Sequence, residues 1–267
     1  MMTNTIAIIG GGNLGSAMAE GLLNSAFCLP QQLIVTKRTI ASLSELAARG
    51  VHVTNNNAEA VTKADWVILA VKPFQIKEVL AEIKPFLKKE KQVLISVVTG
   101  IWIDEIQSIV GADFPIFRAM PNTAIAIQQS MTCINGKSVT DAQTQFAIDL
   151  FNQLGKSVLI EEKLMDAATV LGACGTAYAM RYIRANIQGG IEIGFSAATA
   201  SLIAAQTVKG AAELLLQKNT HPEQEIDKVT TPKGCTIAGL NEMEHQGFSS
   251  SLIKGIVTSY KKIINDM

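Results

Sequence analysis

The sequence has few of the residues that bind metals or form disulfides. Its 267 residues include three histidines and four cysteines. Cys28, Cys133, Cys174 and Cys235 are widely separated, form no Cys-x-x-Cys pair, and are isolated from the histidines. This spacing argues against both a disulfide framework and a zinc site. We therefore expect no metal centre.

The chain also lacks net charge and any long apolar run. Its 23 Lys and Arg balance 23 Asp and Glu, whereas nucleic-acid binding requires clustered cations. The apolar run at residues 5–10 is too short to span a bilayer, and the N-terminus shows no charged region or cleavage signature of a signal peptide. We expect a cytoplasmic protein with neither nucleic acid nor membrane as a partner.

The first part of the chain alternates short β-rich runs with helical patterns. One run, 66–71, is apolar throughout, as in the middle of parallel sheets. The rhythm predicts a doubly wound parallel α/β sheet of Rossmann type. The expected strands are 5–10, 33–36, 51–54, 66–71, 93–98 and 116–120, with 131–134 and 156–160 as edge strands around a helix at 140–154.

Strand patterns end near residue 162. The helical patterns at 164–187, 196–217 and 249–264 are rich in small side chains. We predict a dinucleotide-binding domain at 1–161 and an all-helical domain at 162–267. Small side chains bury little apolar area, which leaves two alternatives: a helical domain that completes its core against another subunit, or an ordinary Ala-rich bundle.

A glycine-rich turn follows the first expected strand and opens a helix. Gly10, Gly12 and Gly15 satisfy the GxGxxG pattern, with Asn13 and Leu14 between them. Such glycines allow a tight turn, close approach of a pyrophosphate and close helix–strand packing. The helix N-terminus would hold the pyrophosphate. The alternative is a glycine-rich turn with no ligand.

The end of the second expected strand indicates which dinucleotide binds. NAD sites usually place Asp or Glu there to hold the ribose hydroxyls. This chain instead has Thr36, Lys37, Arg38 and Thr39. Cations attract a 2′-phosphate, and the planar fork of Arg binds it well. We predict that NADP(H) is preferred, with NAD(H) as the alternative cofactor.

Residues 231–240 place a Pro, a Gly and two Thr between helical stretches. A turn that opens a helix exposes N–H groups that can bind an anion. Gly234 would let a carboxylate approach the backbone, and Thr236 would add a hydroxyl. The alternative is a simple helix cap.

The helical half offers no obvious acid–base residue, because it has no His between 162 and 220. A substrate that is already electrophilic, such as a protonated cyclic imine, needs no carbonyl oxygen to be protonated. Catalysis would then be mainly positioning and electrostatics.

Several segments together resemble the pyrroline-5-carboxylate reductase family over essentially the whole length. They are 8–23, 57–61 with 69–73, 118–123, and 206–210 with His221, Pro222 and 229–240. The resemblance implies reduction of L-1-pyrroline-5-carboxylate, a small anionic cyclic imine, to L-proline by NAD(P)H. It also implies a homodimer through the C-terminal helices, which can extend to a higher homo-oligomer.

The resemblance also assigns site residues. It places the substrate carboxylate on backbone N–H groups of Gly234, Cys235 and Thr236, with Thr231 at the start of the turn. It makes Thr236 the catalytic residue, whose hydroxyl orients or shares a proton with the imine nitrogen. The implied cofactor residues are Gly10, Gly12, Asn13, Leu14, Gly15, Thr36, Lys37, Arg38, Asn57, Ala70, Val71, Lys72, Pro73, Met120, Pro121 and Asn122.

The chain departs from the family pattern in three places. Residues 233–236 replace Gly-Gly-Thr-Thr, 172–178 replace Ser-Gly-Ser-Gly-Pro-Ala-Tyr, and Ala124 replaces a Pro. These changes leave open a reductase of a different cyclic imino acid, or a non-catalytic NADP-binding paralogue. The Lys233 side chain in place of a Gly is tolerated only if that position has a negative φ.

Cys174 and Cys235 both replace small hydroxyl-bearing residues. Two interpretations remain open: the substitutions have no chemical purpose, or the two thiols form a redox-sensitive pair.

Overall fold

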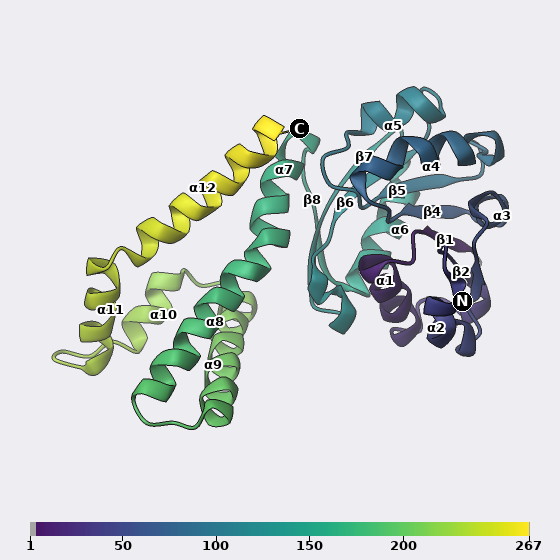
Figure 1. Cartoon of the computed structure of the whole chain (residues 1–267). Coiled ribbons are helices and arrows are strands. Elements are labelled where there is room, and N and C mark those ends of the chain that lie inside the picture. The colour runs from purple at the N-terminus through teal and green to yellow at the C-terminus, as the bar shows by residue number, and fades with distance from the viewer. Residues whose placement is uncertain (1–3, 267) are drawn as a thin grey trace. The chain divides into compact units, whose positions relative to one another are not determined.

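The computed structural model describes residues 4–266, which form two compact units (Figure 1). The sheet unit comprises the described residues up to Cys174 together with Ile263 onward, and the helical unit is Gly175–Lys262. The sheet unit extends past residue 161, and the domain boundary expected there stays a prediction. Among the described residues, no helix combines the length and apolarity needed to cross a membrane.

The sheet unit contains an eight-stranded sheet with the order β3-β2-β1-β4-β5-β6-β7-β8. Neighbouring strands are parallel except for the antiparallel pair β6 and β7. The predicted doubly wound α/β fold is confirmed, and each expected strand is present. The strands are β1 (Ile6–Ile9), β2 (Leu33–Thr36), β3 (His52–Thr54), β4 (Trp66–Leu69), β5 (Val93–Ser96), β6 (Ile116–Met120), β7 (Ser130–Lys137) and β8 (Gly155–Leu159).

Helices cover both faces of this sheet, because successive side chains of a strand point to opposite faces. Ile6 and Ile8 pack in one apolar cluster with α1 (Asn13–Asn24), α2 (Ser44–Ala48) and α6 (Asp141–Asn152). Ala7 and Ile9 pack in a second cluster with α3 (Asn57–Lys63), α4 (Ile76–Ile83) and α5 (Ile103–Val110). The strand order reverses beside β1, where ligands bind in open α/β sheets.

The helical unit has no strand, as predicted for this half of the chain. Within Gly175–Lys262, the buried residues are Ala200 and Ala204, while many large apolar side chains are exposed. The helices are α8 (Gly175–Glu192), α9 (Ala197–Lys218), α10 (Pro222–Lys228), α11 (Cys235–His245) and α12 (Phe248–Asp266), of which α12 continues into the sheet unit. These helices therefore do not enclose a core of their own within one chain.

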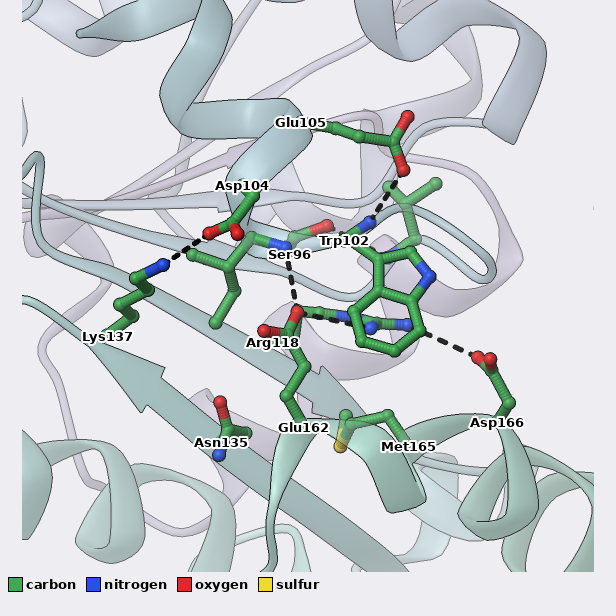
Figure 2. A network of polar contacts seen from close by, with 12 residues as sticks. Ser96, Trp102, Asp104, Glu105, Arg118, Asn135, Lys137, Glu162, Met165 and Asp166 are labelled. Carbon is green, nitrogen blue, oxygen red and sulfur yellow. Dashed lines mark hydrogen bonds and ion pairs between the residues drawn. The ribbon is translucent and has the colours of Figure 1, made fainter. Parts of the chain in front are cut away.

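A buried arginine joins the sheet to the chain that follows it (Figure 2). Arg118 on β6 is 1% exposed; its Nη1 lies 3.3 Å from Glu162 Oε1, and its Nη2 lies 3.6 Å from Asp166 Oδ1. The Trp102 ring covers the guanidinium at 5.3 Å, a cation–π distance. Glu162 Oε1 also accepts a hydrogen bond from the Ile103 N–H.

This cluster explains why the sheet unit extends past residue 161. Asp166 lies on the short helix α7 (Met165–Ala168), which leads into a π-helical segment, Thr169–Cys174. An unpaired buried guanidinium is strongly unfavourable, so the two carboxylates hold this part of the chain against β6.

We expect Arg118→Met to destabilise the protein by about 3 kcal/mol, because it leaves Glu162 and Asp166 without their cation. Urea unfolding followed by circular dichroism would measure this. Lys137→Met is the control, because it removes an exposed ion pair with Asp104 beside the cluster and should leave the midpoint nearly unchanged. Equal midpoints for the two variants would contradict the anchoring role of Arg118.

Candidate cofactor and substrate sites

A cleft of about 1020 Å³ lies at the carboxyl ends of β1, β2, β4 and β5, entirely within the sheet unit. This is where neighbouring parallel strands bring their ends together at the point of reversed order. Most of the predicted cofactor residues line it: Gly10, Gly12, Asn13, Leu14, Thr36, Lys37, Arg38, Asn57, Ala70, Val71, Lys72 and Pro73.

Each of the three motif glycines lacks a side chain for a different physical reason. Gly10 has φ 110°, and a Cβ there would lie 2.6 Å from the carbonyl oxygen of Ala70. A Cβ on Gly15 would lie 2.1 Å from Gly10 O, so Gly15 allows close packing of α1 on the turn and does not line the cleft. A Cβ on Gly12 would meet no protein atom within 4 Å. The protein's own packing does not require Gly12, and this open space fits a bound phosphate.

Thr36 fixes the turn from the neighbouring strand. The Gly11 N–H donates to Thr36 O at 2.6 Å, and the Gly10 N–H donates to Thr36 Oγ1 at 3.3 Å. The Thr36 hydroxyl donates to Asn57 Oδ1 at 2.7 Å, and Asn57 Nδ2 donates to Glu82 at 3.0 Å. The amides of Gly10 and Gly11 are thus used within the protein.

The amides left for an anion are those at the start of α1. Its N-cap, Gly12, provides no side-chain cap. The first N–H groups of a helix have no partner within the helix and carry partial positive charge. The turn therefore presents the amides of Gly12, Asn13 and Leu14 to the cleft, which is the arrangement that binds a pyrophosphate.

The cleft contains cations that the protein does not neutralise. Lys37, Arg38 and Lys72 line it, and none forms an ion pair within residues 4–266. Glu78 and Glu82 also line it, from α4. The end of β2 is followed by Lys37 and Arg38 and carries no carboxylate, as the sequence shows.

The predicted residues Met120, Pro121 and Asn122 do not line the cleft. Met120 ends β6 and is 5% exposed. The Asn122 N–H donates to Ser130 Oγ, its Oδ1 accepts from the Ala124 N–H, and its Nδ2 donates to Gly172 O. Asn122 thus caps the turn at 123–127, three of whose residues line the cleft.

Several lining residues were not predicted. They lie at or follow the carboxyl ends of β1 to β6, or lie on α1 and α4. The shared edge of parallel strands is the signal that could have found those at the strand ends. The unpredicted lining residues are Ile9, Gly11, Ala17, Thr39, Asn55, Gln75, Glu78, Val79, Glu82, Val97, Val98, Thr99, Thr123, Ile125 and Ala126.

The late segment forms a tight turn in the helical unit. The Gly234 N–H donates to Thr231 O at 2.9 Å, and Lys233 has φ 62°. The condition for tolerating a side chain at Lys233, a negative φ, is therefore not met. With Pro232 in the second position, the third residue of a type II turn must take a positive φ. A side chain in this region is unfavourable by about 1 kcal/mol or somewhat more.

Gly234 is the N-cap of α11, and its own position also requires a glycine. A Cβ there would lie 2.5 Å from Thr231 Oγ1. Gly234 gives no side-chain cap, and its N–H is already bonded to Thr231. The N–H groups of Cys235 and Thr236 are thus the first open donors at this helix start. Thr236 is half-buried, whereas Lys233 and Cys235 are exposed.

The cysteines fall into two groups. Burial raises the pKa of Cys28 to about 11 and also raises the pKa of Cys133, so these two thiols are poor nucleophiles. Cys174 is half-buried in the sheet unit, and Cys235 is exposed in the helical unit. Both are free thiols, and their redox pairing stays a hypothesis. No metal-binding cluster occurs between residues 4 and 266.

A dinucleotide cleft of this kind, followed by an all-helical region, defines a nicotinamide-dependent oxidoreductase of the doubly wound class. Residues 5–100 match the family model for NADP oxidoreductase, coenzyme F420-dependent, and residues 162–265 match the model for pyrroline-5-carboxylate reductase dimerisation. The chain belongs to the pyrroline-5-carboxylate reductase family, as its relatives show.

Two relatives come from Dictyostelium discoideum. Pyrroline-5-carboxylate reductase 2 is 45% identical over 96% of this chain and 91% of that protein. Pyrroline-5-carboxylate reductase 1 is 49% identical over 97% of this chain, which spans 49% of that protein's length.

Solved structures agree with this assignment. The chain is 29% identical to a pyrroline-5-carboxylate reductase from Coxiella burnetii, with a TM-score of 0.92 over 99% of this chain and 98% of that one. The Plasmodium falciparum pyrroline carboxylate reductase with NADP bound is 27% identical, with a TM-score of 0.87 over 98% of both chains.

We expect Thr36→Val to weaken NADPH binding by about tenfold, because the Gly10 N–H loses its acceptor and one lost hydrogen bond is about 1.4 kcal/mol. Fluorescence titration with NADPH would measure the dissociation constant. Thr62→Val is the control, since the Thr62 hydroxyl donates only to Ala58 O on α3. Equal affinities for both variants would reject the role of Thr36.

Proposed function

We propose that this protein reduces L-1-pyrroline-5-carboxylate to L-proline with NADPH as the preferred hydride donor. The observation that carries the proposal is that one chain of this family contains two helix N-termini without a side-chain cap. They are the glycine-rich turn at the start of α1 and the turn at the start of α11. The first fits a dinucleotide, and the second fits a carboxylate.

The residues of the cleft would hold the dinucleotide, which supplies a hydride when bound. The amides of Gly12, Asn13 and Leu14 bind its pyrophosphate, and Lys37 with Arg38 binds the 2′-phosphate. Ala70, Val71, Lys72 and Pro73 line the cleft after β4. Gly15 lets α1 pack closely on the turn, and Asn122 caps the 3-10 turn at 123–127; Met120 and Pro121 precede that cap.

The turn before α11 would hold the substrate. The N–H groups of Cys235 and Thr236 bind the carboxylate, while Thr231 and Gly234 close the turn that aims them. The Thr236 hydroxyl orients the imine through a hydrogen bond and does not act as a strong acid. An imine that is already protonated requires positioning and electrostatic stabilisation more than proton transfer.

We also propose that two chains pair through their C-terminal helices. The support is the dimerisation family match at 162–265 and the poor burial within the helical unit. Exposed apolar side chains lie on its helices, among them Leu202, Leu216, Ile253 and Val257, and Ile193 is exposed in the turn after α8. A higher homo-oligomer and the cytoplasmic location stay predictions.

A panel of cyclic imines with NADPH tests the reaction. We expect rapid oxidation of NADPH with L-1-pyrroline-5-carboxylate and formation of L-proline, which chromatography would identify. Turnover of other imines alone would favour a reductase of a different cyclic imino acid. Cofactor binding without any turnover would favour a non-catalytic paralogue.

The cofactor preference depends on Arg38. We expect kcat/KM to be higher with NADPH than with NADH, and Arg38→Ala to reduce the NADPH value by about tenfold or more, since a hydrogen bond to a charged group contributes about 1.5–3 kcal/mol. The NADH value should change little. Arg49→Ala is the control, because Arg49 bonds Asn24 outside the cleft. An NADH value equal to or above that of NADPH in the unaltered protein would overturn the prediction.

The role of Thr236 is tested by Thr236→Val, which keeps the shape and removes the hydroxyl. We expect kcat/KM for the imine to fall about tenfold or more, the effect of one hydrogen bond lost in the transition state. Steady-state kinetics would measure it. Thr220→Val, whose hydroxyl bonds Glu225, should leave the kinetics unchanged. Unchanged kinetics in Thr236→Val would remove its assigned role.

A further inference from the structure

We propose that Asn122 is a positioning residue that couples the cofactor cleft to the π-helical segment Thr169–Cys174, from which α8 begins. This inference rests on the proposed function. It assigns the Asn122 carboxamide to Gly172 rather than to the cofactor.

The three hydrogen bonds of Asn122 fix its orientation completely. Its N–H donates to Ser130 Oγ at 3.0 Å, and its Oδ1 accepts the Ala124 N–H at 3.0 Å. Its Nδ2 donates to Gly172 O at 3.1 Å. The bond to Ala124 caps the 3-10 turn at 123–127, where Thr123, Ile125 and Ala126 line the cleft.

The acceptor lies in a rare backbone conformation. Gly172 belongs to the π-helical segment Thr169–Cys174, inserted between α7 and α8. Such segments shift the hydrogen-bond pattern to i→i+5 and frequently occur at functional sites. A Cβ on Gly172 would meet no atom within 4 Å. Side-chain packing therefore does not fix the position of Gly172. The hydrogen bond from Asn122 Nδ2 to the Gly172 carbonyl oxygen can fix it.

Residues on β6 and just after it hold the chain from α7 to the π-helical segment at two points. Arg118 on β6 holds Asp166 on α7, and Asn122 just after β6 holds Gly172. Between them, the Thr169 hydroxyl is buried and donates to Met165 O at 2.9 Å. Gly175, the first residue of α8, follows the π-helical segment directly. The bond to Asn122 is therefore the last described side-chain hydrogen bond from β6 and its end to this segment before α8 begins.

It follows that the two ends of the Asn122 carboxamide, within the motif at 118–123, have different functions. The Asn122 Oδ1 shapes the cleft through its cap on Ala124, while the Asn122 Nδ2 sets where the π-helical segment ends and α8 starts. Loss of the Nδ2 donor alone, with the cap retained, should therefore affect imine reduction far more than cofactor binding.

The test is Asn122→Ser, because Ser retains a short acceptor for the Ala124 cap and loses the donor that reaches Gly172. The matched control is Asn135→Ser, which removes an equivalent bond from Asn135 Nδ2 to Ile160 O at 2.8 Å. Asn135, which Figure 2 labels, lies on β7 and does not line the cleft. Asn122→Asp is the second variant; it keeps the length and the cap but places an oxygen against Gly172 O.

We expect kcat/KM for the imine to fall by about tenfold in both Asn122 variants, the scale of one lost positioning hydrogen bond. The NADPH dissociation constant should stay within about twofold, the span expected when no direct contact is lost. Amide hydrogen exchange should accelerate in 169–176 but not elsewhere. The Asn135→Ser control should show none of these changes.

Three results would overturn the proposal. The first is an NADPH dissociation constant raised tenfold or more with unchanged exchange in 169–176, the mark of a direct cofactor contact. The second is kinetics in both Asn122 variants equal to those of Asn135→Ser. The third is unchanged exchange in 169–176 in whichever variant folds. Because exchange needs no substrate, it tests this inference even if the imine panel rejects pyrroline-5-carboxylate.

Discussion

The buried positive charge of Arg118 fixes where the chain leaves the sheet and continues into the helices. Arg118 is enclosed in the sheet unit, where an uncompensated guanidinium would be strongly unfavourable. Its counter-charges, Glu162 and Asp166, come from the chain that follows β8. That chain must return to β6 before α8 can begin. The π-helical segment, with its bond to Asn122, continues from this fixed point.

The cofactor cleft depends on small residues that serve different purposes. Gly10 and Gly15 are small because protein atoms occupy the space where a Cβ would lie, whereas Gly12 borders open space. Thr36 accepts hydrogen bonds from the amides of Gly10 and Gly11, so the amides available to an anion are those at the start of α1. A turn that is stabilised by β2 before any ligand arrives is preorganised, which reduces the ordering cost of binding.

The sequence predicted what depends on local periodicity, and it missed what depends on tertiary contact. Alternating apolar runs located the strands, and the GxGxxG spacing located the turn. The lining residues Glu78 and Glu82 lie on α4, whose sequence only shows an amphipathic helix; their place at the cleft follows from the packing of α4 on the sheet. The π-helical segment has no composition that distinguishes it from an α-helix. At Lys233 the turn type outweighed the side-chain preference, since Pro232 had already fixed the preceding φ.

The sparse burial in the helical unit has a kinetic consequence. The sheet unit encloses two apolar clusters and can complete them by intramolecular collapse. The helical unit buries Ala200 and Ala204 and otherwise leaves its apolar side chains on the surface. In the proposed dimer, its final folding step is an encounter between chains, with a rate that scales with chain concentration. In that assembly, a newly made chain passes through a stage in which the cleft of the sheet unit is finished while the proposed substrate turn still awaits a partner chain.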